Sequence, residues 1–135
     1  IRSWERDGII DYLGHSDDVR THYAHANCVV SPSYYREGVP RTLLEAASMG
    51  LPVITTDTAG CRDTVEDGVT GLLVRPRDVD DLVSKMREMV DMTDDARQRM
   101  GSQGRGKMCR DFSEKLVIQR YVDAVKRLGV ISNVT

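Results

Sequence analysis

Two glutamates flank a turn that runs into a predicted helix in the stretch SPSYYREGVPRTLLEAASMG, residues 31–50. Glu37 precedes the helix and Glu45 lies inside it, with seven residues between them. Side chains on a helix tilt towards its amino end, so we expect Glu45 to aim back at the turn. An ionised carboxylate only accepts hydrogen bonds, and the two hydroxyls of a ribose are suitable donors for it. Glu37, on the turn, could accept from the hydroxyls of a bound sugar in the same way.

The turn between the two glutamates has the properties of an anion site. The first free N–H groups of the helix belong to Arg41, Thr42 and Leu43, and with the helix dipole they favour a group such as a diphosphate. Gly38 has no side chain, so a ligand can approach the backbone closely there. A second interpretation stays open: Glu45 is an ordinary acid on the helix surface, and Glu37 is an acid favoured by the dipole. The spacing alone does not decide between the two.

The elements that must position these residues alternate along the chain. Short apolar or β-branched runs predict strands at 9–13, 27–31, 53–56 and 71–74. Helical periodicity predicts helices at about 18–25 and 41–49, one after Asp78, and two more near 94–108 and 114–128. Ser16 or Asp17 can cap the first of these, and Asp78, Thr93 and Ser113 the last three.

This alternation predicts an α/β fold, a Rossmann-like parallel sheet with flanking helices. In such open sheets ligands bind at the carboxyl ends of the strands, where loops run into helix starts. The segments 14–17, 31–41 and 57–63 are therefore the places where a binding site is expected.

Charge and composition exclude several classes of function. The net charge is −2 and the basic residues are scattered among acids, which argues against nucleic acid as a partner. The longest apolar runs are far too short to span a bilayer. Three cysteines without a CxxC pair fit a reducing compartment, so a cytoplasmic location is expected.

Two further patterns are weak as functional signals. Residues 101–107 read G-x-x-x-x-G-K, as in a P-loop, but Met108 stands where Ser or Thr is required and a helical pattern precedes it. His15, His22 and His25 could be imagined as metal ligands, but no carboxylate stands with them in a ligand-like pattern. The sequence therefore predicts neither a P-loop nor a metal site.

The stretch EGVPRTLLE resembles the E-x7-E motif of retaining GT-B glycosyltransferases of the family 4 type. The resemblance continues through AASMGLPVITTDTAGCRDTVEDGVTGLLVRPRD and upstream through IIDYLGHSDDVRTHYAHANCVVSPS, so it covers nearly the whole chain. In the residues of these motifs the chain is most similar to enzymes that build capsular polysaccharides, exopolysaccharides or lipid-linked oligosaccharides at the cytosolic face of a membrane. The resemblance implies a truncated carboxyl-terminal half of a GT-B fold. Residues 1–135 would form one partial nucleotide-sugar-binding domain, with 113–128 as a carboxyl-terminal crossover helix.

The resemblance also implies residue roles. Glu37 would be the catalytic residue that contacts the donor sugar, and Glu45 would bind the ribose hydroxyls. A UDP-sugar is favoured over the GDP and ADP equivalents, with no metal and no further cofactor. The donor sugar and diphosphate would lie against Glu37, Gly38, Val39, Arg41 and Thr42, and the base near Gly14, His15 and Ser16.

The parent protein would transfer a hexose or an N-acetylhexosamine to a polysaccharide or lipid-linked acceptor. Its acceptor-binding domain and two strands of the nucleotide domain are not in this chain, so we expect the fragment to be inactive alone. Membrane contact would come only through the absent half. An exposed sheet edge would favour a homodimer. The alternatives are a non-catalytic sugar-nucleotide binding or interaction module and, less favoured, a GT-B sugar-nucleotide epimerase, for which no suitably placed histidine is found.

Overall fold

The computed structural model describes residues 2–35 and 38–128, and its centre is a parallel sheet of three strands in the order β1-β2-β3. The strands are β1 (Val29–Ser31), β2 (Val53–Thr56) and β3 (Gly71–Val74). Val30 pairs with Ile54, and Ile54 pairs in turn with Leu72. All four residues of β2 are buried, as expected for a central strand covered on both faces. The predicted α/β class with a parallel sheet is confirmed.

Helices cover both faces of the sheet, because successive side chains on a strand point to opposite sides. Val53 packs in one core cluster with Leu43 of α3 (Arg41–Ser48) and Cys61 of α4 (Cys61–Thr64). Ile54, the next residue, packs in a second cluster with Met89 of α5 (Val79–Asp91) and with Met100 of α6 (Asp94–Asp111). The sheet is thus the middle layer between α3 and α4 on one side and α5 with the start of α6 on the other.

Gly101 lets α6 pass close to the backbone of the turn that follows α3. A Cβ atom built on Gly101 would lie 1.8 Å from the carbonyl oxygen of Gly50, and one on Gly104 would lie 3.5 Å from that of Thr70. Both glycines are buried in the middle of α6. The pattern that resembles a P-loop therefore belongs to a helix and serves its packing, and no phosphate-binding loop is formed there.

The three predicted helix caps are confirmed by side-chain hydrogen bonds. The Asp78 carboxylate accepts from the N–H of Asp81 at 2.9 Å and so starts α5. The Thr93 hydroxyl accepts from the N–H of Ala96 at 3.2 Å at the start of α6. The Ser113 hydroxyl accepts from the N–H of Leu116 at 3.4 Å and starts α7 (Glu114–Arg127).

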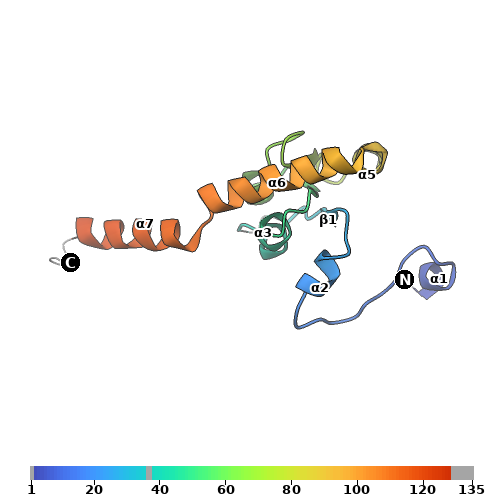
Figure 1. The fold of residues 1–135 in the computed structure, drawn as a ribbon, viewed down its shortest axis with the longest axis horizontal. Helices are drawn as coiled ribbons and strands as arrows, with labels where there is room; N and C mark the ends of the chain where they lie inside the picture. The colour runs from blue at the N-terminus through green and yellow to red at the C-terminus, as the bar shows by residue number, and fades with distance from the viewer. Residues whose placement is uncertain (1, 36–37, 129–135) are drawn as a thin grey trace.

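The predicted strand at 9–13 is wrong, because this segment forms no regular structure. It links α1 (Arg2–Arg6) to α2 (Arg20–Tyr23), and the side chains of Ile9, Tyr12 and Leu13 on it are exposed. Figure 1 shows α1 standing well away from the sheet. A strand needs a neighbour to hydrogen-bond with, and within the described residues no strand lies beside this segment. The alternation of apolar residues at 9–13 therefore does not make a strand without such a neighbour.

Two other predicted elements have different boundaries in the structure. The helix predicted at 18–25 is only the single turn α2, and the strand predicted at 27–31 begins at Val29. At the other end of the molecule α7 projects beyond the compact centre, and none of its residues is buried (Figure 1). The central layer therefore carries the packing, and the two ends of the described chain extend from it.

Candidate functional site

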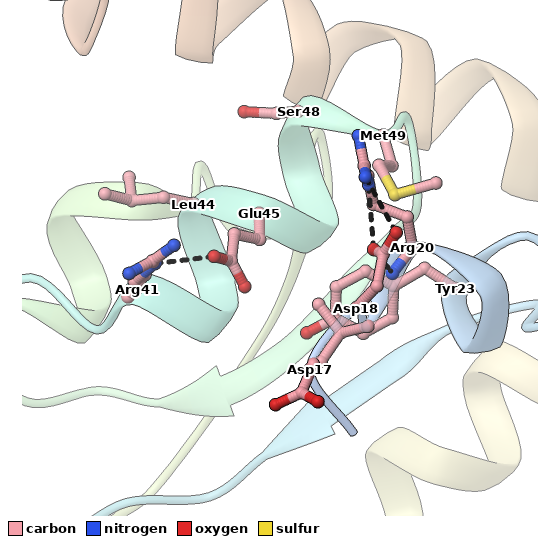
Figure 2. A pocket seen from close by; sticks show the side chains of 10 residues that line it. Asp17, Asp18, Arg20, Tyr23, Arg41, Leu44, Glu45, Ser48 and Met49 are labelled. Atoms are coloured by element: carbon pink, nitrogen blue, oxygen red, sulfur yellow. Dashed lines mark hydrogen bonds and ion pairs between the residues drawn. The ribbon is translucent and has the colours of Figure 1, made fainter.

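A cavity of about 500 Å³ opens between α3 and the segment that leads into α2 (Figure 2). These two walls are close because Tyr23 of α2 packs against the core cluster that contains Leu43 of α3. The cavity is lined by Asp17, Asp18, Val19, Arg20, Tyr23, Arg41, Leu44, Glu45, Ser48 and Met49.

The α3 wall presents a carboxylate and a guanidinium from neighbouring turns of the helix. The Arg41 Nε donates to the Glu45 Oε1 at 2.6 Å, as residues four apart on a helix can. The Glu45 side chain is 34% exposed and that of Arg41 is 89% exposed, so both groups can be reached from the cavity. Glu45 keeps its second oxygen as an acceptor for a ligand.

The start of α3 has two backbone N–H groups for which the described residues provide no acceptor. Pro40 precedes the helix with φ −65° and ψ 126°, and no side chain caps it. Within the described part of the chain, the N–H groups of Arg41 and Thr42 meet no acceptor. The expectation for Leu43 is wrong, because its N–H donates to the Pro40 carbonyl at 3.1 Å in a tightened first turn. Among the described residues, the amino end of α3 therefore has two N–H groups without an acceptor, one fewer than predicted.

The opposite wall is built around an ion pair. Asp18 accepts from the Nε of Arg20 at 2.8 Å and from its Nη2 at 2.7 Å, and also from the Arg20 backbone N–H at 3.0 Å. These hydrogen bonds from Arg20 lower the pKa of Asp18 to about 2. The predicted caps Ser16 and Asp17 are wrong, since it is Asp18 that satisfies the first N–H of α2.

Tyr23 links the two walls. Burial raises the pKa of its phenol, and the negative charge of Glu45 raises it further. The phenol therefore stays protonated near neutral pH and lies close enough to Glu45 to feel its charge. Glu45 thus faces the cavity beside a donor and beside the Arg41 guanidinium.

Only some of the predicted site residues line the cavity. Glu45 and Arg41 line the cavity, whereas Gly38, Val39 and Thr42 lie at the start of α3 just outside it. Glu37 lies outside the described residues, so its role stays a prediction.

The predicted base-proximal loop, 14–16, comes just before the lining residues of the cavity in the chain. Gly14, His15 and Ser16 precede the lining residue Asp17 but do not themselves line the cavity. The His15 side chain is 89% exposed and its Nε2 lies 3.3 Å from the Asp17 carboxylate. Ser16 donates from its hydroxyl to the Asp18 carbonyl at 3.0 Å. The proximity of this loop to a base stays a prediction.

Several lining residues were not predicted from the sequence. Leu44 and Ser48 are four residues apart, as are Glu45 and Met49, so helical periodicity could have placed all four on one side of α3. Asp18, Arg20 and Tyr23 gave no such signal, because nothing local in the sequence says that α2 packs opposite Glu45.

The third segment where a site was expected, 57–63, forms the loop after β2 and the start of α4. The Arg62 Nε pairs with the Asp57 carboxylate at 2.8 Å, and the Asp63 carboxylate accepts from the N–H of Gly60 at 3.3 Å. None of these residues lines the cavity. The charged side chains of this segment therefore pair within the segment, and the cavity is lined by α3, α2 and the residues just before α2.

The described part of the chain shows neither a metal-binding cluster nor a membrane-spanning helix. Among residues 2–35 and 38–128, no three side chains of His, Cys, Asp or Glu gather closely enough to hold a metal ion. In the same part of the chain, no helix is both long enough and apolar enough to cross a membrane.

Comparison with known proteins gives consistent results. The family model described as Glycosyl transferases group 1 matches residues 2–92. The capsular polysaccharide biosynthesis glycosyltransferase CapM of Staphylococcus aureus is 31% identical over 105 residues, which are 78% of this chain and 27% of that protein. The chain spans between 27% and 32% of the length of three curated relatives that it matches.

Solved structures share the fold over almost the whole chain. A glycosyltransferase from Rickettsia africae ESF-5 has a TM-score of 0.87 and 22% identity, covering 97% of this chain and 35% of that chain. The Anabaena protein HepE, solved in complex with UDP, has a TM-score of 0.83 and 22% identity, covering 93% of this chain and 35% of its own. At this level of identity the likeness shows the fold, and the predicted relation to GT-B glycosyltransferases is confirmed.

Proposed function

The chain belongs to the glycosyl transferases group 1 family, and we propose from this membership that it binds the nucleotide-diphosphate-sugar donor of a sugar transfer. The whole protein would be a retaining enzyme that transfers a hexose or N-acetylhexosamine to a polysaccharide or lipid-linked acceptor. The relatedness to CapM, a capsular polysaccharide biosynthesis glycosyltransferase, supports a polysaccharide acceptor. UDP is the favoured nucleotide, since HepE has been solved with UDP and with UDP-glucose.

The observation that carries the proposal is the cavity beside the start of α3. Glu45 lines it with one oxygen held by Arg41 and the other available to ribose hydroxyls. The N–H groups of Arg41 and Thr42 and the dipole of α3 suit a diphosphate next to it. Charges of both signs on the two walls then fit a ligand that carries phosphates at one end and hydroxyls at the other.

The chemistry proposed for this part of the protein is stabilisation of the leaving group. As the bond from the sugar to the diphosphate breaks, negative charge grows on the diphosphate oxygens. Fixed N–H donors and the Arg41 guanidinium would stabilise that charge without having to reorganise. Glu37 would contact the donor sugar and help to hold it in position for attack.

The main binding site for the acceptor would be in another part of the protein. The exposed apolar side chains of α7, among them Val117, Ile118 and Tyr121, support the proposal that this helix crosses towards an acceptor-binding domain. The chain alone would bind donor and would transfer no sugar.

Calorimetric titration of the chain with UDP, UDP-glucose and GDP tests the donor site. We expect saturable binding of UDP, weakened on the order of tenfold in Glu45→Ala, because a hydrogen bond to a charged group is worth about 1.5–3 kcal/mol. Glu88→Ala is the matched control, since Glu88 on α5 also pairs with a basic neighbour, Lys85, at 2.9 Å. This control removes the same charge away from the cavity.

Three outcomes would count against the proposal. Equal UDP affinity in Glu45→Ala and in the unmodified chain would sink the ribose assignment. Tighter binding of GDP would overturn the choice of nucleotide. Absence of binding to all three nucleotide ligands would contradict the donor site in this chain.

A further inference from the structure

A second hollow, of about 420 Å³, lies at the carboxyl ends of all three strands. Pro32 and Tyr34 follow β1, Thr56 ends β2, and Val74 ends β3, while Leu82 of α5 closes the other side. It shares no residue with the cavity between α2 and α3. Its Val74 and Leu82 belong to the opposite core cluster, the one beneath α5 and α6. In open α/β sheets this edge is where ligands bind.

An aromatic stack with an arginine on top borders the hollow. The rings of Tyr34 and Tyr35 are stacked with centroids 4.4 Å apart, and their hydroxyls hydrogen-bond at 3.0 Å. The guanidinium carbon of Arg77 lies 4.8 Å from the centroid of the Tyr34 ring. A cation above a ring is held by the face of its guanidinium, which leaves the N–H donors at its edge for another partner.

Arg77 is held in a strained position. With φ 60° it is the single non-glycine residue of positive φ in the described ranges 2–35 and 38–128. Such a conformation costs on the order of 1 kcal/mol or more and persists where the surroundings hold it, often at a binding site. Its neighbour Arg75 differs, because it pairs with Asp78 at 3.0 Å and with Asp81 at 3.5 Å and so stabilises the loop. Arg77 is therefore the arginine of this loop that is presented to a ligand.

The chemistry of the walls selects a neutral ligand with both apolar and hydroxyl faces. Pro32, Val74, Val79 and Leu82 supply an apolar floor. The carboxylates of the α5 start, including Asp78, offset the positive charge of the arginines, so a polyanion gains little there. A sugar ring has C–H faces for the apolar floor and hydroxyls for the guanidinium edge. A floor of this kind with a few fixed polar groups is typical of a small-molecule site.

We propose that this second hollow is a saccharide subsite that holds a neutral sugar unit of the acceptor, an inference that rests on the proposed function. The donor cavity lies along α3, on the other side of the sheet from this hollow. Arg77 hydrogen-bonds the hydroxyls of the unit, and the Tyr34 ring holds the guanidinium in place.

The test is a ¹H–¹⁵N NMR titration of the full chain with methyl α-D-glucopyranoside and with N-acetylglucosamine. We expect saturable shifts at the amides of Tyr34, Arg77 and Val79 at tens of millimolar sugar. Arg77→Gly should weaken this binding on the order of tenfold. This variant should still fold, because glycine adopts a positive φ without strain. Arg87→Ala, which removes an exposed arginine of α5 away from the hollow, should bind the sugars as the unmodified chain does.

The outcomes separate this inference from the proposed function. Sugar binding that is unchanged in Arg77→Gly, or absent in the unmodified chain, overturns the subsite even where UDP binds. Shifts at the same amides with inorganic phosphate and with neither sugar would assign the hollow to an anion and overturn it too. Sugar shifts at Tyr34 that depend on Arg77, in a chain that fails to bind UDP, support the subsite and contradict the donor site.

Discussion

Replacing Gly101 by alanine tests the close approach of α6 to the central layer. The added methyl carbon would lie 1.8 Å from the Gly50 carbonyl oxygen, 2.7 Å from its carbonyl carbon and 3.3 Å from the Pro52 Cδ. Two of these three atoms are backbone, so no side-chain rotation can relieve the clash. The helix must move away from the turn that follows α3, and this separates packed surfaces.

The magnitude follows from two opposing effects. Overpacking of this kind costs about 3 kcal/mol or more when backbone has to move. Alanine is favoured over glycine inside a helix by about 1 kcal/mol. We therefore expect Gly101→Ala to lower the free energy of unfolding by about 2 kcal/mol or more, a large part of the stability of a small protein.

Gly106→Ala is the matched control on the same helix. Nothing lies within 4 Å of a Cβ at Gly106, so only the helix preference acts there. We expect this variant to gain about 0.5–1 kcal/mol. At Gly104 the nearest atom is 3.5 Å away, an ordinary contact, and alanine there should change stability little.

Urea unfolding followed by far-ultraviolet circular dichroism measures all three variants. The midpoint should fall for Gly101→Ala and rise for Gly106→Ala, with the slope unchanged in both. Equal midpoints for Gly101→Ala and Gly106→Ala would refute the close approach of α6 to Gly50. In that case the glycines of 101–107 would need an explanation other than packing.

Two further predictions concern titration and reactivity. Asp18 should titrate with a pKa of about 2 by carbon-detected NMR, and Arg20→Ala should move this pKa back towards 3.8. Because the folded pKa is lowered, the stabilising pair is complete above pH 4 and is lost as the pH falls through about 2. An unmoved pKa in Arg20→Ala would contradict the pairing. Burial raises the pKa of the Cys28 thiol to about 11, so at pH 8 a disulfide reagent should modify the exposed Cys109 first. Cys109→Ser should remove that fast phase of the reaction. A fast phase that persists in Cys109→Ser would show that another thiol is accessible.

Local sequence signals predicted much of the fold. The β-branched run at 53–56 formed the central strand β2, and Asp78, Thr93 and Ser113 capped the helices they precede. A cap joins residues three apart, and a buried strand needs only a short apolar run. Both are properties of neighbouring residues, so they can be read without knowing the rest of the structure.

Signals that depend on a distant partner failed. The apolar alternation at 9–13 satisfies the pattern of a strand, but within the described residues no strand lies beside it. The sequence predicted no P-loop at 101–107, but it did not show that the Gly50 carbonyl lies against Gly101 of α6. A sequence gives the type of each residue, but it does not show which distant residues lie beside it in the folded chain.

The candidate site divides in the same way. The sequence by itself determined the helix start at Arg41, which follows Pro40, and it favoured a position of Glu45 towards the turn without deciding it. Only the tertiary structure decided the second wall, where Asp18 and Arg20 face Glu45, and the hollow that Arg77 and Tyr34 border. Those residues are more than twenty positions from their partners, and packing of the two core clusters brings them together. Helix periods and caps act over one turn of chain, whereas the choice of which surfaces meet depends on the burial of the whole core.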